Sequence, residues 1–408
     1  MATARTYEYS VRDRQGKLVK GRIEANNPAV VANRLKVMGM APLSIDEVQN
    51  TGLQRELKIP GFGPKVSLKD LAVMTRQMAT MISAGLSLLR ALSILAEQSE
   101  NKELAKVIGH VRNDVEAGVA LSDAMGRSPD IFPPLMVNMI RAGEIGGFLE
   151  RSLLSVASNY EAEVKLRGQI KSAMTYPVVV FCMAIVAVIG MLLFIVPVFE
   201  KMFQDLGGAL PAPTQFLVFL SGTMKYVVPV MVVGLISFSV WWRKHKNDES
   251  VRSRLDPLRL KIPVFGPLFQ KVAISRFTRN FGTMMGAGVP ILQALSIVGE
   301  TSGNWVIERA VKDVQESVRT GQSLSGPLAQ HPVFPPMVVQ MIATGEDAGA
   351  LEVMLAKISE FYDQEVEATT EQLTSLIEPL MIGVIGVIIG GMVIALYMPM
   401  FSIFELIQ

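Results

Sequence analysis

The stretch FPPLMVNMIRAGEIGGFLE at residues 132–150 occurs a second time in the chain, as FPPMVVQMIATGEDAGALE at residues 334–352. The two copies are offset by 202 residues (334 − 132) and share the signature Gly-Glu-x-x-Gly-x-Leu-Glu. Paired prolines followed by apolar residues at helical spacing predict the start of a packed helix in each copy. A repeat of this period indicates two copies of one domain.

The match continues on both sides of this stretch, at nearly the same offset. It reaches the head of a long apolar run in each copy, so each repeat is expected to lead from a water-facing domain directly into a hydrophobic segment. The matched segments are 80–85 with 283–288, 118–122 with 321–325, 160–164 with 362–366, and Pro177 with Pro379.

Apolar residues within each repeat recur at helical spacing. Leu71, Met74 and Met78, for example, fall on one face of a helix. We interpret these methionine-rich faces as core, because Met fills irregular gaps between helices. Each repeat is therefore predicted to be an all-α bundle of about six helices, at 68–175 and 271–378.

Three runs without charged residues are long enough to cross a membrane, at 178–196, 226–242 and 380–398. At a rise of about 1.5 Å per residue, a helix of 19 residues covers roughly 28 Å, close to the hydrocarbon thickness of a bilayer. The mean hydropathy of +0.35 fits a few such helices attached to substantial water-facing mass. We expect three transmembrane helices.

The distribution of basic residues predicts the orientation of these helices. Three cations at 165–171 precede the first run and a basic cluster at 243–246 follows the second, whereas the connector at 197–225 has no net charge. By the positive-inside rule, the N-terminus and the segment 247–378 are expected in the cytoplasm and the connector outside. The predicted location is the inner membrane, crossed several times.

The first 56 residues form a different module, joined to the first repeat by a Gly- and Pro-rich linker at 57–67. The fold class predicted for the chain is therefore an all-α membrane protein with two homologous cytoplasmic helical bundles, three transmembrane helices and a small α+β N-terminal module. That module is predicted to contain strands at 7–11, 18–23 and 43–45 and a helix at 28–38.

The sequence carries no motif of a catalytic or metal site. The single cysteine, Cys182, excludes an intramolecular disulfide and a cysteine-based zinc site. Gly16-Lys17 is the only Gly-Lys pair and is not followed by Ser or Thr as in a P-loop, and the three histidines lack metal-ligand spacing. The net charge of +2 gives no field toward nucleic acid. We expect no enzyme activity, cofactor, metal or nucleic-acid partner.

As a set, these features resemble the bacterial platform-protein family, known as PilC in type IV pili and GspF in type II secretion. The resemblance covers essentially the whole chain. It rests on the N-terminal Tyr-x-Tyr…Asp-x-x-Gly-Lys pattern, on TRQMATMISAG at 75–85 and on the paired glutamate signatures. The sequence RQMATMI at 76–82 favours the pilus branch.

The resemblance implies partners and a role. Members couple a hexameric cytoplasmic secretion ATPase to the extraction and insertion of pilin subunits, together with other inner-membrane assembly proteins, and this chain is expected to form homo-oligomers. The alternative is the secretion homologue, which acts on pseudopilins. A membrane transporter is disfavoured because the predicted spans contain no ionisable residue.

Four candidate contact residues are matched between the repeats. Glu144 and Glu346, in the signature, either form acidic contact or cation sites together with Glu150 and Glu352, or have a structural role, which we favour. In that role Gly143 and Gly345 end a helix in the left-handed conformation and each glutamate favours the next helix N-terminus. For Arg76 and Arg279 we favour internal salt bridges over partner contacts.

The fifth candidate, Glu378, is where the repeats differ. It precedes Pro379, whereas the first repeat has Tyr176 before Pro177. We favour exposure of its carboxylate to water at the headgroup level. The alternative, which rests on the family resemblance, is transient binding of the N-terminal ammonium of a pilin.

Overall fold

A computed structural model describes residues 5–12, 18–25, 30, 41–47, 66–205, 210–246 and 248–406. The chain divides into two units, Met1–Lys65 and Val66–Gln408. The predicted helix at 28–38 and most of the linker at 57–67 lie outside the described residues. The α+β class of the N-terminal module therefore stays a prediction.

The first unit contains an antiparallel sheet of three strands in the order β2-β1-β3. In β1 (Arg5–Arg12), Tyr7 pairs with Ile23 of β2 (Leu18–Ala25). The other edge of β1 pairs with β3 (Ala41–Glu47), with a shift in register after Ser10.

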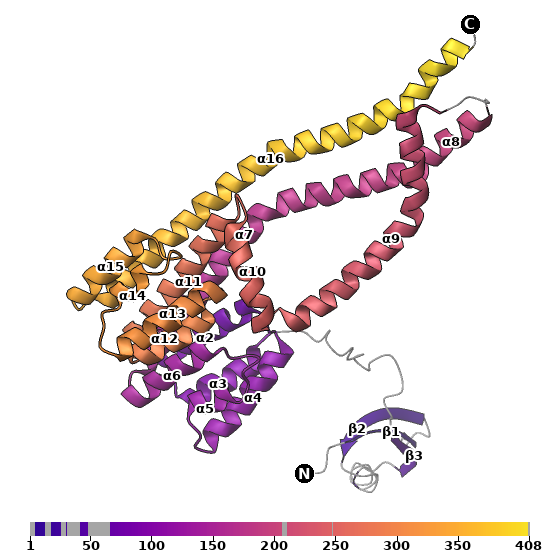
Figure 1. Ribbon diagram of the computed structural model, residues 1–408. Coiled ribbons are helices and arrows are strands. Elements are labelled where there is room, and N and C mark those ends of the chain that lie inside the picture. The colour runs from indigo at the N-terminus through magenta and orange to yellow at the C-terminus, as the bar shows by residue number, and fades with distance from the viewer. Residues whose placement is uncertain are drawn as a thin grey trace. The chain divides into compact units, whose positions relative to one another are not determined.

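The first repeat consists of six helices, as the periodicity predicts, and the last continues beyond the bundle (Figure 1). A capping box at Ser67 and Asp70 satisfies backbone N–H groups at the start of the first helix. The helices are α2 (Leu68–Ser83), α3 (Leu88–Gln98), α4 (Lys102–Glu116), α5 (Leu121–Gly126), α6 (Pro134–Gly146) and α7 (Leu149–Gly190).

The second repeat has the same six helices in the same order. Gly85 and Gly288, which occupy matched positions just after the first helix of each repeat, both have positive φ, at 84° and 70°. The helices are α11 (Gly266–Gly286), α12 (Ile291–Thr301), α13 (Trp305–Arg319), α14 (Ser325–Ala329), α15 (Pro336–Asp347) and α16 (Leu351–Leu406).

One apolar core runs through both repeats. Met74 and Met78 are buried in the first repeat, which confirms the interpretation of the Met-rich face. Phe277 and Phe281 occupy the matched positions of the second repeat, where Phe277 also packs against Phe334 with ring centroids 5.3 Å apart. The two cores keep the apolar pattern but fill it with different side chains.

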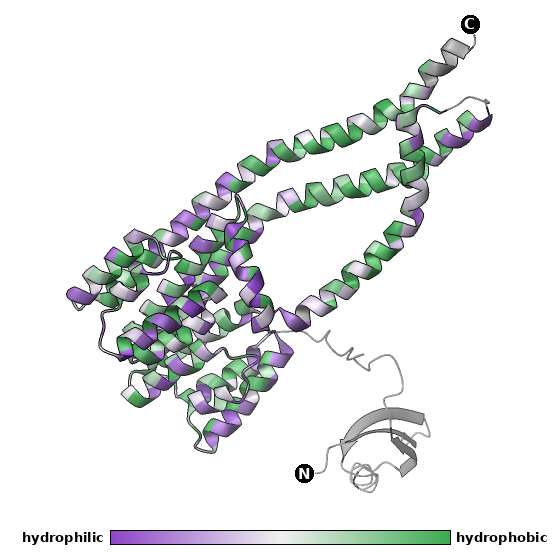
Figure 2. Ribbon diagram, viewed as in Figure 1, coloured by the Kyte–Doolittle hydropathy of each residue, from purple (hydrophilic) through white to green (hydrophobic). Residues whose placement is uncertain are grey.

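Three helical segments in the described residues are long and apolar enough to cross a membrane, at Leu149–Asp205, Ala212–Trp242 and Leu351–Pro399. They contain the three predicted runs, but each helix is much longer than its apolar run. Figure 2 shows the change from mixed to hydrophobic residues along α7, α9 (Ala212–His245) and α16 beyond the bundles. After α9, α10 (Glu249–Lys261) returns the chain to the second bundle.

The predicted connector at 197–225 is mostly helical. A π-helical turn, η1 (Met191–Ile195), joins α7 to α8 (Val196–Asp205), and α9 begins only six residues after α8 ends. Pro197 lies just after the π-helical turn and lacks the N–H that the carbonyl of Leu193 would otherwise accept from, whereas the matched Pro399 lies inside α16 without such a turn. Hydropathy alone missed this helical extension because the flanking turns carry charged residues.

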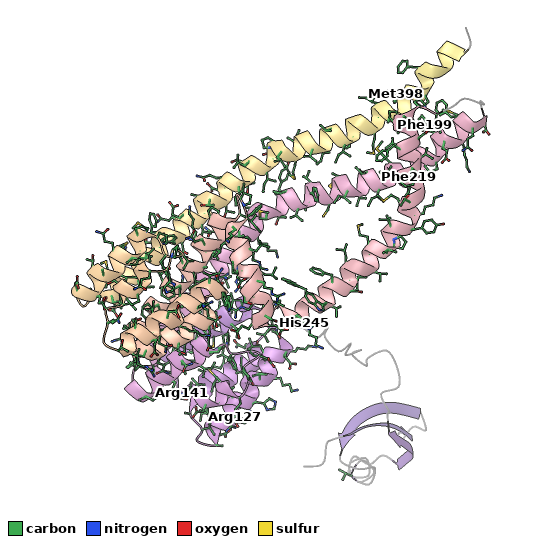
Figure 3. All side chains as sticks on the ribbon, in the orientation of Figure 1. Arg127, Arg141, Phe199, Phe219, His245 and Met398 are labelled. Atoms are coloured by element: carbon green, nitrogen blue, oxygen red, sulfur yellow. The ribbon has the colours of Figure 1, made fainter. Side chains whose placement is uncertain are left out.

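At their ends away from the bundles, the three membrane helices pack together. Their contact is an apolar cluster of Leu192, Val196, Leu217, Met392, Ala395 and Leu396. The hydroxyl of Thr214 also donates to the carbonyl of Ala395, at 2.5 Å. Figure 3 labels Phe199 and Met398 near this contact and His245 at the opposite end of α9.

Candidate functional site: the signature and the junction of the repeats

The repeated signature brings α6 close to α7 and α15 close to α16. A β-carbon at Gly143 would lie 2.5 Å from the Ser152 hydroxyl oxygen, and one at Gly345 would lie 2.9 Å from Cγ of Met354. Both glycines lie inside their helices, so the prediction that they end them is wrong. The left-handed residue after each helix is instead Gly147 or Gly349.

The signature glutamates cap short helices that precede them in the chain. The Glu144 carboxylate accepts from the backbone N–H groups of Leu121 (2.5 Å) and Ser122 (3.0 Å), at the start of α5. Glu346 accepts in the same way from Leu324 (2.8 Å), at the start of α14. A carboxylate stabilises a helix N-terminus, where N–H groups lack intrahelical partners.

These hydrogen bonds give both glutamates the kind of structural role that was predicted, at a helix N-terminus. The predicted helix was wrong, because each glutamate caps a helix that precedes it and not the next one. The partner helix lies about twenty residues upstream, and no local pattern in the sequence indicates that contact. The same arrangement in both repeats identifies it as part of the shared fold.

Arg76 and Arg279 each form an internal salt bridge with matched partners. Arg76 binds both carboxylate oxygens of Glu161, at 2.6 and 2.5 Å. Arg279 pairs with Asp363, the residue that corresponds to Glu161. The hydrogen bonds from Arg76 hold the pKa of Glu161 below its usual value. Both expected internal salt bridges are present, and a partner contact by either arginine stays a prediction.

The two salt bridges differ in their surroundings. The Arg76 side chain is 37% exposed, whereas that of Arg279 is 9% exposed and also lies 3.7 Å from Glu163 of the first repeat. Glu163 accepts from Arg276 at 2.8 Å as well. The matched position of Arg276 in the first repeat is Val73, so the first repeat has no cation at this position that could form the equivalent salt bridge.

A second polar contact joins the repeats beside these arginines. The Asn159 amide donates to Asn280 (3.1 Å) and to the hydroxyl of Thr283 (3.2 Å). Phe361 occupies the position of Asn159 in the second repeat. The junction thus joins residues that differ between the copies, such as Arg276 and Asn159, to residues that both copies share, such as Glu163 and Thr283.

Next to this junction, α7, α11 and α16 enclose an open cleft of about 740 Å³. Charges of both signs line it, including Arg151 and Lys165 on α7 and Glu360 and Glu367 on α16. Two of its three walls, α7 and α16, are helices that continue into the candidate membrane spans. In the described residues no three Cys, His, Asp or Glu side chains are arranged to hold a metal ion.

Residues 74–197 and 277–399 both match the family described as Type II secretion system (T2SS), protein F. Residues 1–46 match the N-terminal domain of the same protein. The chain belongs to the protein F family. The two matched segments coincide with the repeats identified from the signature, which confirms the resemblance drawn from the sequence.

Relatives from both branches of the protein F family align over almost the whole chain. The type IV pilus assembly protein PilC of Thermus thermophilus is 42% identical over 97% of this chain and 98% of its own length. That of Myxococcus xanthus is 41% identical over 100% and 97%. The type II secretion system protein F of Vibrio cholerae is 32% identical over 98% and 99%. By sequence identity, these two pilus proteins are more similar to the chain than the secretion protein is.

The fifth candidate residue of this protein F homologue, Glu378, lies within α16 and is exposed. It is not part of the junction, and the structure does not bring it together with the other four candidates. Its exposure is consistent with a carboxylate that faces water where the apolar run begins.

The repeats of this protein F homologue also match in a segment that was predicted to be part of the linker. LKIPGFGP at 57–64, assigned to the linker, agrees with LKIPVFGP at 260–267 in seven of eight positions. In the second copy this segment ends α10 and begins α11, and Val264 has a positive φ of 74°. The first copy has glycine at that position, which is the residue that adopts this conformation without strain.

Proposed function

We propose that the protein is a non-enzymatic inner-membrane platform for type IV pilus assembly, which couples a cytoplasmic ATPase to the extraction and insertion of pilins. The observation that carries this proposal is the continuity of α7 and α16, of 42 and 56 residues, from the bundles into the apolar segments. At about 1.5 Å per residue they extend roughly 63 and 84 Å. Helices of this length transmit a tilt of either bundle to its span.

The junction between the repeats is suited to such a movement. Its contacts include the Glu163–Arg276 salt bridge and the Asn159 hydrogen bonds, beside the open cleft. Asn159 is buried, but Arg276 and Glu163 are 23% and 13% exposed, and such partly hydrated polar contacts exchange partners at lower cost than a packed apolar core. A motor that contacts 68–175, 247–378 or both would change the angle between the bundles, and the spans would follow.

The proposed orientation places both bundles and the N-terminus in the cytoplasm, where a secretion ATPase has access to them. The basic residues at 165–171 and 243–246 support it. Reporter fusions at Gln49 and Asn304 are expected to report cytoplasm, and a fusion at Gly208 the opposite side. A cytoplasmic signal at Gly208 would overturn this orientation.

A flexible insertion tests the coupling directly. Four residues (Gly-Ser-Gly-Ser) placed between Thr175 and Tyr176 interrupt α7 just before its apolar segment, while the bundle stays intact. The expected result is normal insertion and normal ATPase binding, with pilus assembly lost. The matched control carries the same insertion between α8 and α9 and keeps assembly. Full assembly with the insertion in α7 would refute transmission through that helix.

The greater similarity to pilus proteins favours pilins over the pseudopilins of type II secretion as the cargo. Identification of the pilin that copurifies with the protein distinguishes the two. The proposal also includes homo-oligomers and other inner-membrane assembly proteins as partners, as the family resemblance implies.

A further inference from the structure

A pocket of about 510 Å³ lies between α7, α10 and α11 and shares Arg276 with the junction. Four of its lining side chains are cations: Arg167 and Lys171 of α7, Arg259 of α10 and Arg276 of α11. The lining includes a single acid, Asp256. Helix α7 and the consecutive helices α10 and α11 thus place positive charge around one pocket.

Nearby carboxylates neutralise only part of this charge. Glu163 pairs with both Arg167 (2.6 Å) and Arg276 (2.8 Å), and Asp256 pairs with Arg259 (3.2 Å). Four cations against two carboxylates leave an excess of two positive charges (4 − 2). Lys171 is exposed and has no ion-pair partner among the described residues. The pocket therefore favours an anion.

The position of the pocket along the membrane helices is the second observation. Met174 in its wall lies four residues before the first apolar run at 178–196. The guanidinium of Arg259 lies 5.9 Å from the ring centre of Trp242, at the end of the second apolar run. Tryptophan at the end of a span is typical of the membrane–water interface. The pocket thus lies at headgroup depth, on the side of the bundles.

Exposed apolar side chains lie in the pocket wall and on the α10–α11 corner that adjoins it along the chain. Phe269, in the pocket wall, is 37% exposed, and Leu258 and Val264 of the α10–α11 corner are 60% and 51% exposed. A free anion would make no favourable contact with these apolar side chains. An amphiphile would pair its charged headgroup with the cations and pack its apolar chains against the apolar side chains. We propose that the pocket binds the phosphate headgroup of an anionic phospholipid in the leaflet that faces the bundles, with its acyl chains along these apolar residues.

This proposal does not depend on the cargo or on the motor. The test uses the full chain in neutral detergent, with retention of phosphatidylglycerol and phosphatidylcholine measured by native mass spectrometry. We expect selective retention of phosphatidylglycerol, and roughly thirtyfold weaker binding in the double variant Lys171→Gln/Arg259→Gln, since each interfacial cation contributes about a factor of five. Melting of both proteins in phosphatidylcholine nanodiscs checks that the variant is folded.

The control variant Arg90→Gln/Lys106→Gln removes the same charge from exposed positions of α3 and α4 and is expected to bind as the wild type does. Equal retention of the two lipids, or an equal loss in the control, would refute the proposal. So would displacement of the lipid by an equal concentration of inorganic phosphate, which identifies an ion site. Normal lipid binding by the Lys171→Gln/Arg259→Gln variant with loss of ATPase binding would reassign the pocket to a protein contact.

Discussion

The two repeats share their helices but not their surfaces. The glutamate caps, the close glycine contacts and the Arg–carboxylate pairs recur in both. One partner in each main junction contact does not: Arg276 and Asn159 correspond to Val73 and Phe361. Shared residues build each bundle, and the contact between the bundles needs residues that only one copy carries.

A second difference lies on the side of each bundle formed by its fourth and fifth helices. In the first repeat Arg141, labelled in Figure 3, bridges to Asp123 at 3.0 Å across α5 and α6. Ala343 and Gly326 occupy the matched positions, and a groove of about 370 Å³ lies between α14 and α15. The fourth and fifth helices are thus bridged by an ion pair in the first repeat and have a groove between them in the second.

The matched arginines give the largest expected contrast. Arg279→Ala removes the buried cation that pairs with Asp363, although Glu163 keeps Arg276, and is expected to cost about 3 kcal/mol of unfolding free energy. Arg76→Ala removes a half-exposed ion pair and is expected to cost about 1 kcal/mol or less. Denaturant unfolding of the two variants measures the difference. Equal costs would contradict the different roles of these positions.

The signature glutamates are expected to behave alike. Glu144→Gln and Glu346→Gln each weaken the cap of a short helix, with an expected cost of about 1–2 kcal/mol. Thermal unfolding measures both, and ATPase binding by the folded variants is expected to be unchanged. A variant of wild-type stability that has lost ATPase binding would identify that glutamate as a contact residue instead.

At the corner between α10 and α11, where Val264 has a positive φ, a substitution is expected to raise stability and not to lower it. Val264→Gly introduces the glycine of the first copy at a left-handed φ and is expected to stabilise the protein by up to about 1 kcal/mol. Ile262→Gly, two residues earlier, where the backbone is extended at a φ of −62°, serves as the control and is expected to destabilise it. A loss of stability in Val264→Gly would show that the side chain outweighs the strain.

Much of the bundle architecture was predictable from the sequence, and the junction was not. Helix number, spans and buried methionines follow from spacing and hydropathy, which are local properties of the chain. The cap between Glu144 and α5 and the Glu163–Arg276 link join residues far apart in sequence, so no local pattern reports them. The missed LKIP match at 57–64 was visible, but its prolines and glycines are also typical of linkers.

The smallest expected effect on stability belongs to Glu378. Its exposure predicts that Glu378→Gln unfolds and inserts as the wild type does. If Glu378 receives the ammonium of a pilin, the variant assembles far fewer pili while still binding the ATPase. Wild-type assembly at normal expression would leave Glu378 as a water-facing residue at the head of the third span.

Movement of the bundles and spans together is the central claim, and pulsed electron spin resonance measures it. In a Cys182→Ala background, one pair of labels is placed at Glu103 and Arg319 on the two bundles. A second pair is placed at Met183 and Ile388 on the first and third spans. Both distance distributions are predicted to shift when the partner ATPase turns over ATP in nanodiscs. Turnover that leaves the span distances unchanged would contradict transmission from the bundles to the membrane.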